Sequence, residues 1–245
     1  MGNKNRSPFY DNALLLMGIT LCLWVITIID QNTPDWNLTI NYGIKPKIAT
    51  GILGIFTAPF IHINYPHLIG NTLPFMVLGG MVLFSGRRKF IFTSILSALI
   101  SGIGIWIFAR EGTIHTGAST LIFSYLGFII IQAWITRSLL SATLAIVSGA
   151  LYGTLLLTLL INQEGISWHG HLFGLIGGLV SGFLILSSPS QKKRKAVIKI
   201  DKLIKLPYPL LVEAKQPLHP ESQAHEQEQD LDRVRFPLVD MASHL

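Results

Sequence analysis

The stretch GHLFGLIGGLVSGFLILS, residues 170–187, decides the fold class of this chain. It contains no Asp, Glu, Lys or Arg, and an apolar helix of about 20 residues is long enough to cross the hydrocarbon core of a bilayer. Five similar stretches precede it in the chain, at about residues 13–29, 67–84, 90–109, 118–135 and 139–161. The sequence therefore predicts an all-α membrane protein, a bundle of six transmembrane helices.

The composition of the whole chain supports this class. Half of the 245 residues are hydrophobic and only 13% are charged, with a mean hydropathy of +0.50, whereas a soluble domain carries roughly 25% charged residues. The charges also gather in the last quarter of the chain, after residue 188. A soluble protein with one large core is therefore excluded.

The placement of the basic residues predicts the orientation of the helices. The formal net charge is +6, and basic runs at 87–89 and 192–195 flank apolar stretches. Such runs set membrane topology and contact anionic headgroups, so nucleic acid is not an expected partner. With a cytoplasmic N-terminus these runs lie inside, together with Lys4, Arg6 and Arg137. The outer side then receives only Lys45, Lys47 and Arg110. We therefore expect a multi-pass protein of the cell (inner) membrane with both termini in the cytoplasm.

The chain divides into three regions: a cytoplasmic N-terminus (1–12), the six-helix domain (13–188) and a polar cytoplasmic tail (189–245). The composition of the tail is typical of a largely disordered segment, with a short amphipathic piece at about 197–206. A long first extracytoplasmic loop, residues 30–66, separates the first two helices. Its semi-apolar stretch 52–60 is expected to form an interfacial or re-entrant segment.

Three of the predicted helices begin with polar groups at the outer face. One opens with His67 and Asn71, which lie four residues apart and therefore share a helical face. The others open with Gly117-Ala118-Ser119 and with His169-Gly170-His171. Because polar groups inside a membrane are costly, they mark candidate functional sites. A serine, a histidine and a His/Asn pair are thus predicted to share one shallow layer of the membrane.

These residue types suit acyl transfer. A serine hydroxyl becomes a good nucleophile when a neighbouring base accepts its proton, and the reaction also needs donors that stabilise an oxyanion. Ser119 lies near a helix N-terminus, where backbone N–H groups are free. His171 is the candidate base, and His67 and Asn71 are candidate donors. No carboxylate lies at this depth in any predicted helix, so we expect a Ser–His dyad.

Small residues explain how the dyad is brought together. After His171, glycines recur at four-residue spacing: Gly174, Gly178 and Gly182. The helix of the candidate nucleophile presents a matching face: Ser119, Phe123 and Gly127. Such ridges let helices approach closely, which favours a hydrogen bond between Ser119 and His171. Phe123 is expected to pack on the His171 ring.

This ordered set of motifs resembles the rhomboid family of intramembrane serine proteases. The matching pieces are His62…His67-x-x-x-Asn71, Gly117-x-Ser119, His171-x-x-Gly174-x-x-x-Gly178 and the loop sequence Tyr42-Gly43-Ile44-x-Pro46. The resemblance covers about residues 10–188. It implies Ser119 as nucleophile, His171 as base, and His67 with Asn71 as oxyanion stabilisers. It also implies transmembrane proteins as substrates and no cofactor.

One residue departs from the family pattern. The family usually has Gly directly after the catalytic serine, and this chain has Thr120. A β-branched side chain at this position is expected to crowd the oxyanion hole or to narrow the substrate groove.

Each side chain taken alone has a simpler interpretation. Serines in membrane helices often bond to the preceding turn, and His171 alone fits a satisfied interface histidine. His169 beside His171 suggests a metal pair, but no Asp, Glu or Cys converges on it, so no metal is expected. His62 is expected to be structural or substrate-facing, and His115 to be a bystander in a polar loop.

Two other function classes compete with a protease. A weak or inactive rhomboid-like protein that binds transmembrane clients is expected to lack Ser119 or His171, and both are present. A small transporter or channel is expected to show inverted repeats or broken helices, and neither is visible in the sequence. A serine endopeptidase is therefore predicted, with its oligomeric state left open.

Overall fold

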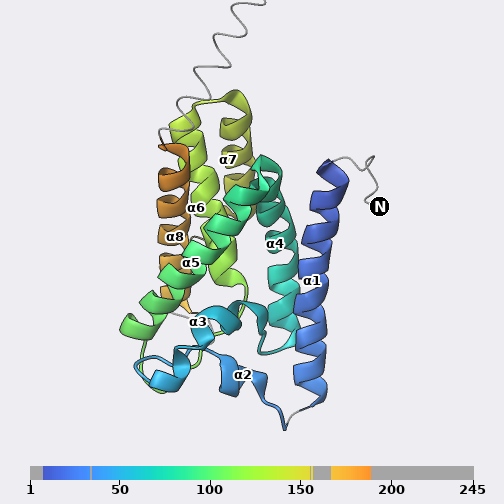
Figure 1. The fold of residues 1–245 in the computed structure, drawn as a ribbon, viewed down its shortest axis with the longest axis vertical. Helices are drawn as coiled ribbons and strands as arrows, with labels where there is room; N and C mark the ends of the chain where they lie inside the picture. Colours follow the sequence, from blue (N-terminus) through green and yellow to red (C-terminus); the bar gives the residue numbers. More distant parts are fainter. Residues whose placement is uncertain (1–7, 34, 155, 157–166, 189–245) are drawn as a thin grey trace, which may run out of the picture. The chain divides into compact units, whose positions relative to one another are not determined.

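The computed structural model describes residues 8–33, 35–154, 156 and 167–188 (Figure 1). Five of its helices are long and apolar enough to cross a membrane: α1 (Pro8–Asn32), α4 (Tyr65–Ser85), α5 (Arg87–Phe108), α6 (Ser119–Thr136) and α8 (Trp168–Leu186). The predicted all-α membrane fold is confirmed.

The fifth predicted helix is described only in part. Helix α7 (Leu139–Tyr152) begins where that helix was expected to begin, and the last part of the predicted range, 157–161, lies outside the described residues. The count of six transmembrane helices therefore stays a prediction. Residues 1–7 and the tail from residue 189, with its expected amphipathic piece at 197–206, also lie outside the described part.

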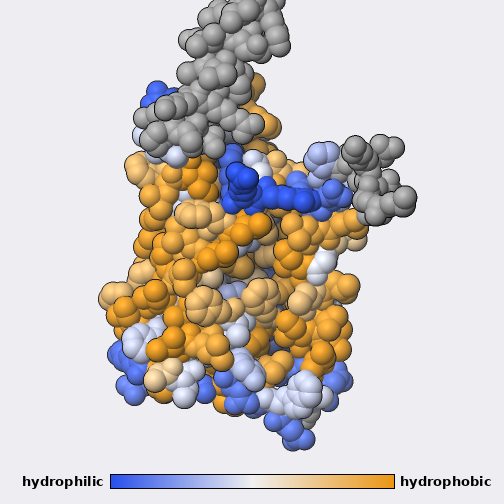
Figure 2. Space-filling model, viewed as in Figure 1, coloured by the Kyte–Doolittle hydropathy of each residue, from blue (hydrophilic) through white to orange (hydrophobic). Residues whose placement is uncertain are grey.

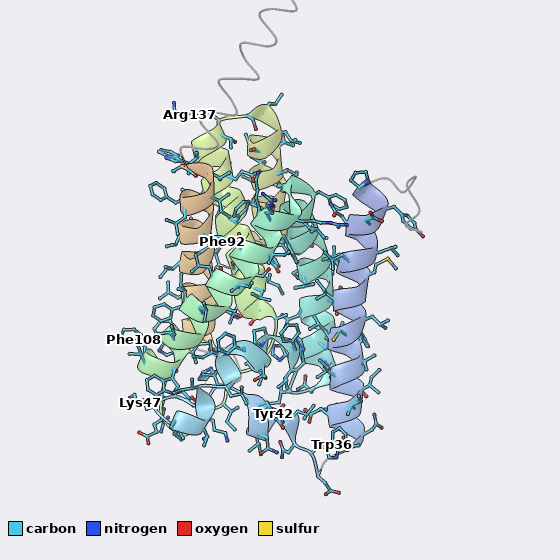
Figure 3. All side chains as sticks on the ribbon, viewed as in Figure 1. Trp36, Tyr42, Lys47, Phe92, Phe108 and Arg137 are labelled. Atoms are coloured by element: carbon cyan, nitrogen blue, oxygen red, sulfur yellow. The ribbon has the colours of Figure 1, made fainter. Side chains whose placement is uncertain are left out.

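The loop between α1 and α4 folds into short helical segments: α2 (Leu38–Tyr42), η1 (Ala49–Gly51), α3 (Gly54–Thr57) and η2 (Ala58–Phe60). Asp30, near the end of α1, accepts hydrogen bonds from the Leu38 backbone N–H (2.7 Å) and the Thr39 hydroxyl (3.3 Å). Figure 3 shows Trp36, Tyr42 and Lys47 of this loop at one end of the helices, with Arg137 at the other. The loop therefore lies at the end where α4, α6 and α8 begin (Figure 1).

Local capping fixes where two of these helices begin. The Asn64 side chain accepts a hydrogen bond from the His67 backbone N–H (2.8 Å) and caps α4. The Ser167 side chain accepts one from the Gly170 N–H (3.2 Å) and caps α8. Asn and Ser are favoured caps because their side chains satisfy first-turn donors. These caps place His67 and His171 in the first turns of their helices.

Glycines bring α6 and α8 into direct backbone contact. A side chain at Gly174 would collide with the Thr120 carbonyl, and one at Gly178 with the Ser124 carbonyl. Gly127 of α6 faces the Leu175 carbonyl in the same way, at 2.5 Å from an added Cβ. The predicted close approach of the two small-residue ridges is confirmed.

Hydroxyl pairs connect α5 to both of these helices. Ser124 of α6 donates to Ser97 of α5 (2.5 Å), and Ser181 of α8 donates to Thr93 of α5 (3.2 Å). All four side chains are buried. Paired hydroxyls of this kind are a common way to join helices where water is absent.

The outer surface of the helices suits a lipid environment. Figure 2 shows a broad hydrophobic band with hydrophilic residues toward both ends. Several of the most exposed side chains are large and apolar, among them Leu139 (86% exposed), Trp134 (73%) and Ile146 (71%). In water such a surface would be costly, whereas lipid tails cover it without penalty.

Candidate active site

Ser119 is the first residue of α6, and the loop before it is held at two consecutive amides. The Gly117 N–H donates to the Ala58 carbonyl (2.9 Å), and the Ala118 N–H donates to Nε2 of His62 (3.2 Å). Gly117 has φ +110°, a conformation that L side chains rarely adopt. The next amide is that of Ser119, and the first N–H groups of a helix have no partner within the helix.

His171 lies against the same helix as Ser119. Its buried ring stacks on Phe123, with ring centroids 4.2 Å apart and an interplanar angle of 11°. Phe123 follows Ser119 by one helical turn, so the expected packing of Phe123 on His171 is confirmed. Gly174, one turn after His171 on α8, faces the Thr120 carbonyl, so the start of α8 packs against the start of α6 at two successive turns.

His67 and Asn71 approach the loop from α4. A Cβ added at Gly117 would lie 2.6 Å from Cε1 of His67 and 3.4 Å from Nδ2 of Asn71. Asn71 Nδ2 and His67 Nδ1 are buried without a hydrogen-bond partner within the described part of the chain. Buried polar atoms normally find partners. Here they form a group of unused polar atoms next to the residues that precede Ser119.

The His62 ring contacts both the Ala118 amide and the His67 ring, and the sequence did not predict these two contacts. Its ring is fully buried and meets His67 edge to face, with centroids 5.2 Å apart. Burial, with a smaller contribution from the nearby His67, lowers the pKa of His62 to about 3, and the Phe60 carbonyl acts in the opposite direction. His62 is therefore neutral, with Nε2 free to accept the Ala118 N–H.

A small cavity opens beside Ser119. Its volume of about 10 Å³ is room for about one water molecule. Four other hydroxyl side chains line it, from α5, the loop before α6, α6 itself and the residue before α8: Ser101, Thr116, Thr120 and Ser167. Apolar side chains form much of the remaining wall, including Ile44, Ile55 and Ile105. Ser101 and Ser167 carry no motif signal, since serines recur throughout these helices.

Two further histidines lie at this end, and one of them, His115, lines the same cavity as Gly117 and Ser119. His169 stacks on Trp168, with centroids 3.8 Å apart, and His115 pairs with the Thr113 hydroxyl (2.8 Å). Burial, together with the nearby His169, lowers the pKa of His115 to about 4. Among the described residues, no three His, Cys, Asp or Glu side chains gather as a metal site would need.

Comparisons with known proteins agree on one family. A family model described as "Rhomboid domain" matches residues 49–188. The uncharacterized protein Rv1337 of Mycobacterium tuberculosis is 34% identical over 197 residues, which cover 77% of this chain and 81% of the relative. The Bacillus subtilis protein named "Putative rhomboid protease YdcA" is 26% identical over 189 residues, which cover 76% of this chain and 92% of the relative.

Proposed function

The chain belongs to the rhomboid family of intramembrane proteases, and on this premise we propose that it is a serine endopeptidase that uses a Ser119–His171 dyad. One observation carries the proposal. The His171 ring stacks on Phe123, one turn beyond Ser119 on α6. The glycines of α8 bring its backbone against the same turn of α6. Nucleophile and base therefore come from one tightly packed interface.

Each group has a defined role in the proposed reaction. His171 accepts the proton of the Ser119 hydroxyl as the serine oxygen attacks the carbonyl carbon of the scissile peptide bond. The C–N bond then breaks, and His171 returns the proton to the leaving amine. A water molecule hydrolyses the acyl-enzyme with His171 again as base, which releases the acid product and restores Ser119.

The oxyanion of the tetrahedral intermediate needs donors in fixed positions. The backbone N–H of Ser119 is one candidate, because the two preceding amides are already bound to Ala58 and His62. The side chains of His67 and Asn71 are the others, since both lie against Gly117 and carry unused polar atoms. All three approach the start of α6.

The proposed substrates are transmembrane proteins cleaved near the outer membrane face. A peptide bond within a helix is shielded, and its carbonyl is already hydrogen bonded, so the substrate must unwind locally before Ser119 attacks. The loop segments lie at the same end of the bundle, and α3 and η2 line the cavity beside Ser119, which supports access from that end.

Covalent labelling tests the proposed function. A fluorophosphonate probe is expected to label the full-length wild-type protein in detergent, and Ser119→Ala is expected to abolish the label. Cleavage of a model transmembrane substrate is measured on the same samples. A wild-type protein that neither reacts nor cleaves would instead support the client-binding alternative.

The proposed orientation has a separate test. Single cysteines at Ser85 and Ser190 are expected to react with impermeant reagents only from the cytoplasmic side, in a variant with Cys22→Ser. A cysteine at Gln163 is expected to react only from outside. The reversed pattern would place the candidate site at the cytoplasmic face and overturn the orientation.

A further inference from the structure

Gly170 lies directly behind the wall of the cavity beside Ser119. A Cβ added to Gly170 would lie 3.0 Å from Cγ2 of Thr120, 3.1 Å from Oγ of Ser167 and 3.2 Å from Cδ1 of Ile105. These three side chains all line the cavity. A side chain at position 170 would therefore press on three parts of the cavity wall at once.

Thr120 is the most constrained of these three residues. Its carbonyl faces Gly174 and its methyl group faces Gly170, so two glycines of α8 flank it. Thr120 cannot move away from α8 by a shift of its backbone, because that backbone forms part of the first turn of α6, directly after Ser119. The Thr120 methyl group thus occupies the room that a side chain at position 170 would need, which keeps it at the edge of the cavity.

We propose that Thr120 and Gly170 form a size-matched pair that sets which substrate side chain the cavity beside Ser119 admits. The proposal rests on the proposed function, because the cavity matters for specificity only if Ser119 is the nucleophile. The described lining consists of hydroxyls, apolar side chains and the His115 ring, with no carboxylate or ammonium group. The matching ligand is an uncharged side chain next to the scissile bond.

Substitutions at positions 120 and 170 are expected to shift the preferred size of the substrate side chain in opposite directions. Loss of the Thr120 methyl group enlarges the cavity and favours larger substrate side chains. A methyl group at position 170 pushes Thr120 inward and favours smaller ones. Combining a smaller residue at position 120 with a larger one at position 170 restores the size of the cavity and the wild-type preference among substrate side chains. A hydrophobic pocket discriminates one methylene group by roughly tenfold or more, which sets the expected size of each shift.

The experiment uses the full-length protein and a model transmembrane substrate whose cleavage site has been mapped. The substrate residue on the N-terminal side of the scissile bond is varied among Gly, Ala, Val and Leu. We measure kcat/KM for wild type, Thr120→Ser, Thr120→Ala, Gly170→Ala and the double variant Thr120→Ala/Gly170→Ala. Thr120→Ser removes only the methyl group that faces Gly170, so it remains informative if Gly170→Ala does not fold.

We expect Thr120→Ser and Thr120→Ala to raise the Val-to-Ala ratio of kcat/KM roughly tenfold. Gly170→Ala lowers the Ala-to-Gly ratio by a similar factor, and the double variant returns to the wild-type order. Gly149→Ala and Thr136→Ala serve as matched controls, because an added Cβ at Gly149 meets nothing within 4 Å and Thr136 lies at the far end of α6.

Three outcomes overturn the proposal. In one, Thr120→Ser and Thr120→Ala change the rate for every substrate equally and leave the ratios unchanged. In another, the double variant loses kcat/KM for every substrate by the product of the factors measured for the two single variants, and the wild-type order of substrates does not return. In the third, wild-type protein neither cleaves nor reacts at Ser119 with a fluorophosphonate, which overturns the proposed function as well. Cleavage with unchanged ratios overturns the size-matched pair alone.

Discussion

Helix α6 packs against α8 and against α4 in different ways. Toward α8, glycines such as Gly178 leave backbone against backbone. Toward α4, aromatic rings fill the space, with Phe75 and Tyr125 at a centroid distance of 5.9 Å. The proposed dyad thus comes from an interface whose spacing is fixed by main chain. The proposed oxyanion side chains come from a helix whose position depends on side chains, which can repack.

The largest expected effect concerns the α6–α8 interface, which contributes Ser119 and His171. Ser119→Ala and His171→Ala are each expected to abolish cleavage of a model transmembrane substrate, because the proposed mechanism assigns the nucleophile and the base to these two side chains alone. Cleavage is followed by gel shift, with thermal unfolding as the control for folding. Comparable cleavage by either variant would contradict the dyad.

The second prediction concerns α4. Loss of one oxyanion donor typically lowers kcat by about 10²–10³. We expect His67→Ala and Asn71→Ala each to weaken turnover, yet less than the loss of Ser119, because the Ser119 backbone N–H remains. Single-turnover rates at saturating substrate measure this effect. If the double variant turned over at the wild-type rate, both side chains would be structural only.

A pair of glycine substitutions compares the two interfaces directly. Gly178→Ala places a methyl group against the Ser124 carbonyl, whereas Gly79→Ala on α4 meets the edge of the Tyr125 ring of α6, with Cε2 at 3.1 Å. Overpacking typically costs about 1–3 kcal/mol, while the higher helix propensity of Ala offsets part of a milder contact. We therefore expect a clear loss of thermal stability for Gly178→Ala and a smaller loss for Gly79→Ala. Equal losses would remove the distinction between the two interfaces.

The contact between His62 and Ala118 predicts a pH effect. The pKa of His62 is about 3 in the folded protein, against the ordinary value of 6.5. The folded state therefore resists protonation, so this contribution to stability is complete above pH 6.5 and is lost as the pH falls toward 3. Between pH 7 and 5 the loss is at most about 2 kcal/mol.

His62→Gln isolates this contribution, because its side-chain oxygen reaches about as far as Nε2 and can accept the Ala118 N–H but does not titrate in this range. Thermal unfolding of both proteins from pH 7 to pH 5 is expected to show a shallower decline for His62→Gln. Parallel declines would assign the pH dependence to other groups.

The smallest expected effect concerns Thr120. If its side chain narrows the substrate groove, Thr120→Gly raises turnover, chiefly through kcat. Gly costs about 0.8–1.0 kcal/mol relative to Ala inside a helix, but Thr120 lies in the first turn of α6, where the penalty is smaller. Cleavage rate is compared with thermal stability for Thr120→Gly and Thr120→Ala. Lower activity of both variants at unchanged stability would show that Thr120 contributes to the site.

The sequence predicted the helices and their contacts because both follow local patterns. Apolar runs define the helices, and glycines at four-residue spacing predicted the contact that places His171 on Phe123. No such pattern predicted the hydrogen bond from the Ala118 N–H to the His62 ring. It depends on an aperiodic loop that returns over the start of α6, and its partner is a backbone amide that any residue except Pro carries. Ser101 was missed because nothing in its neighbourhood distinguishes it from Ser94 or Ser97.

Helix α8 comes last among the described helices, yet it packs on both α5 and α6 and carries the proposed base. A ribosome therefore exposes Ser119 long before it makes His171. On the proposed mechanism, a nascent chain that ends before Trp168 has a nucleophile without its base, and Gly127 of that chain still lacks its partner. On the same mechanism, cleavage requires that α8, the last described helix, has been synthesised and has packed against α6.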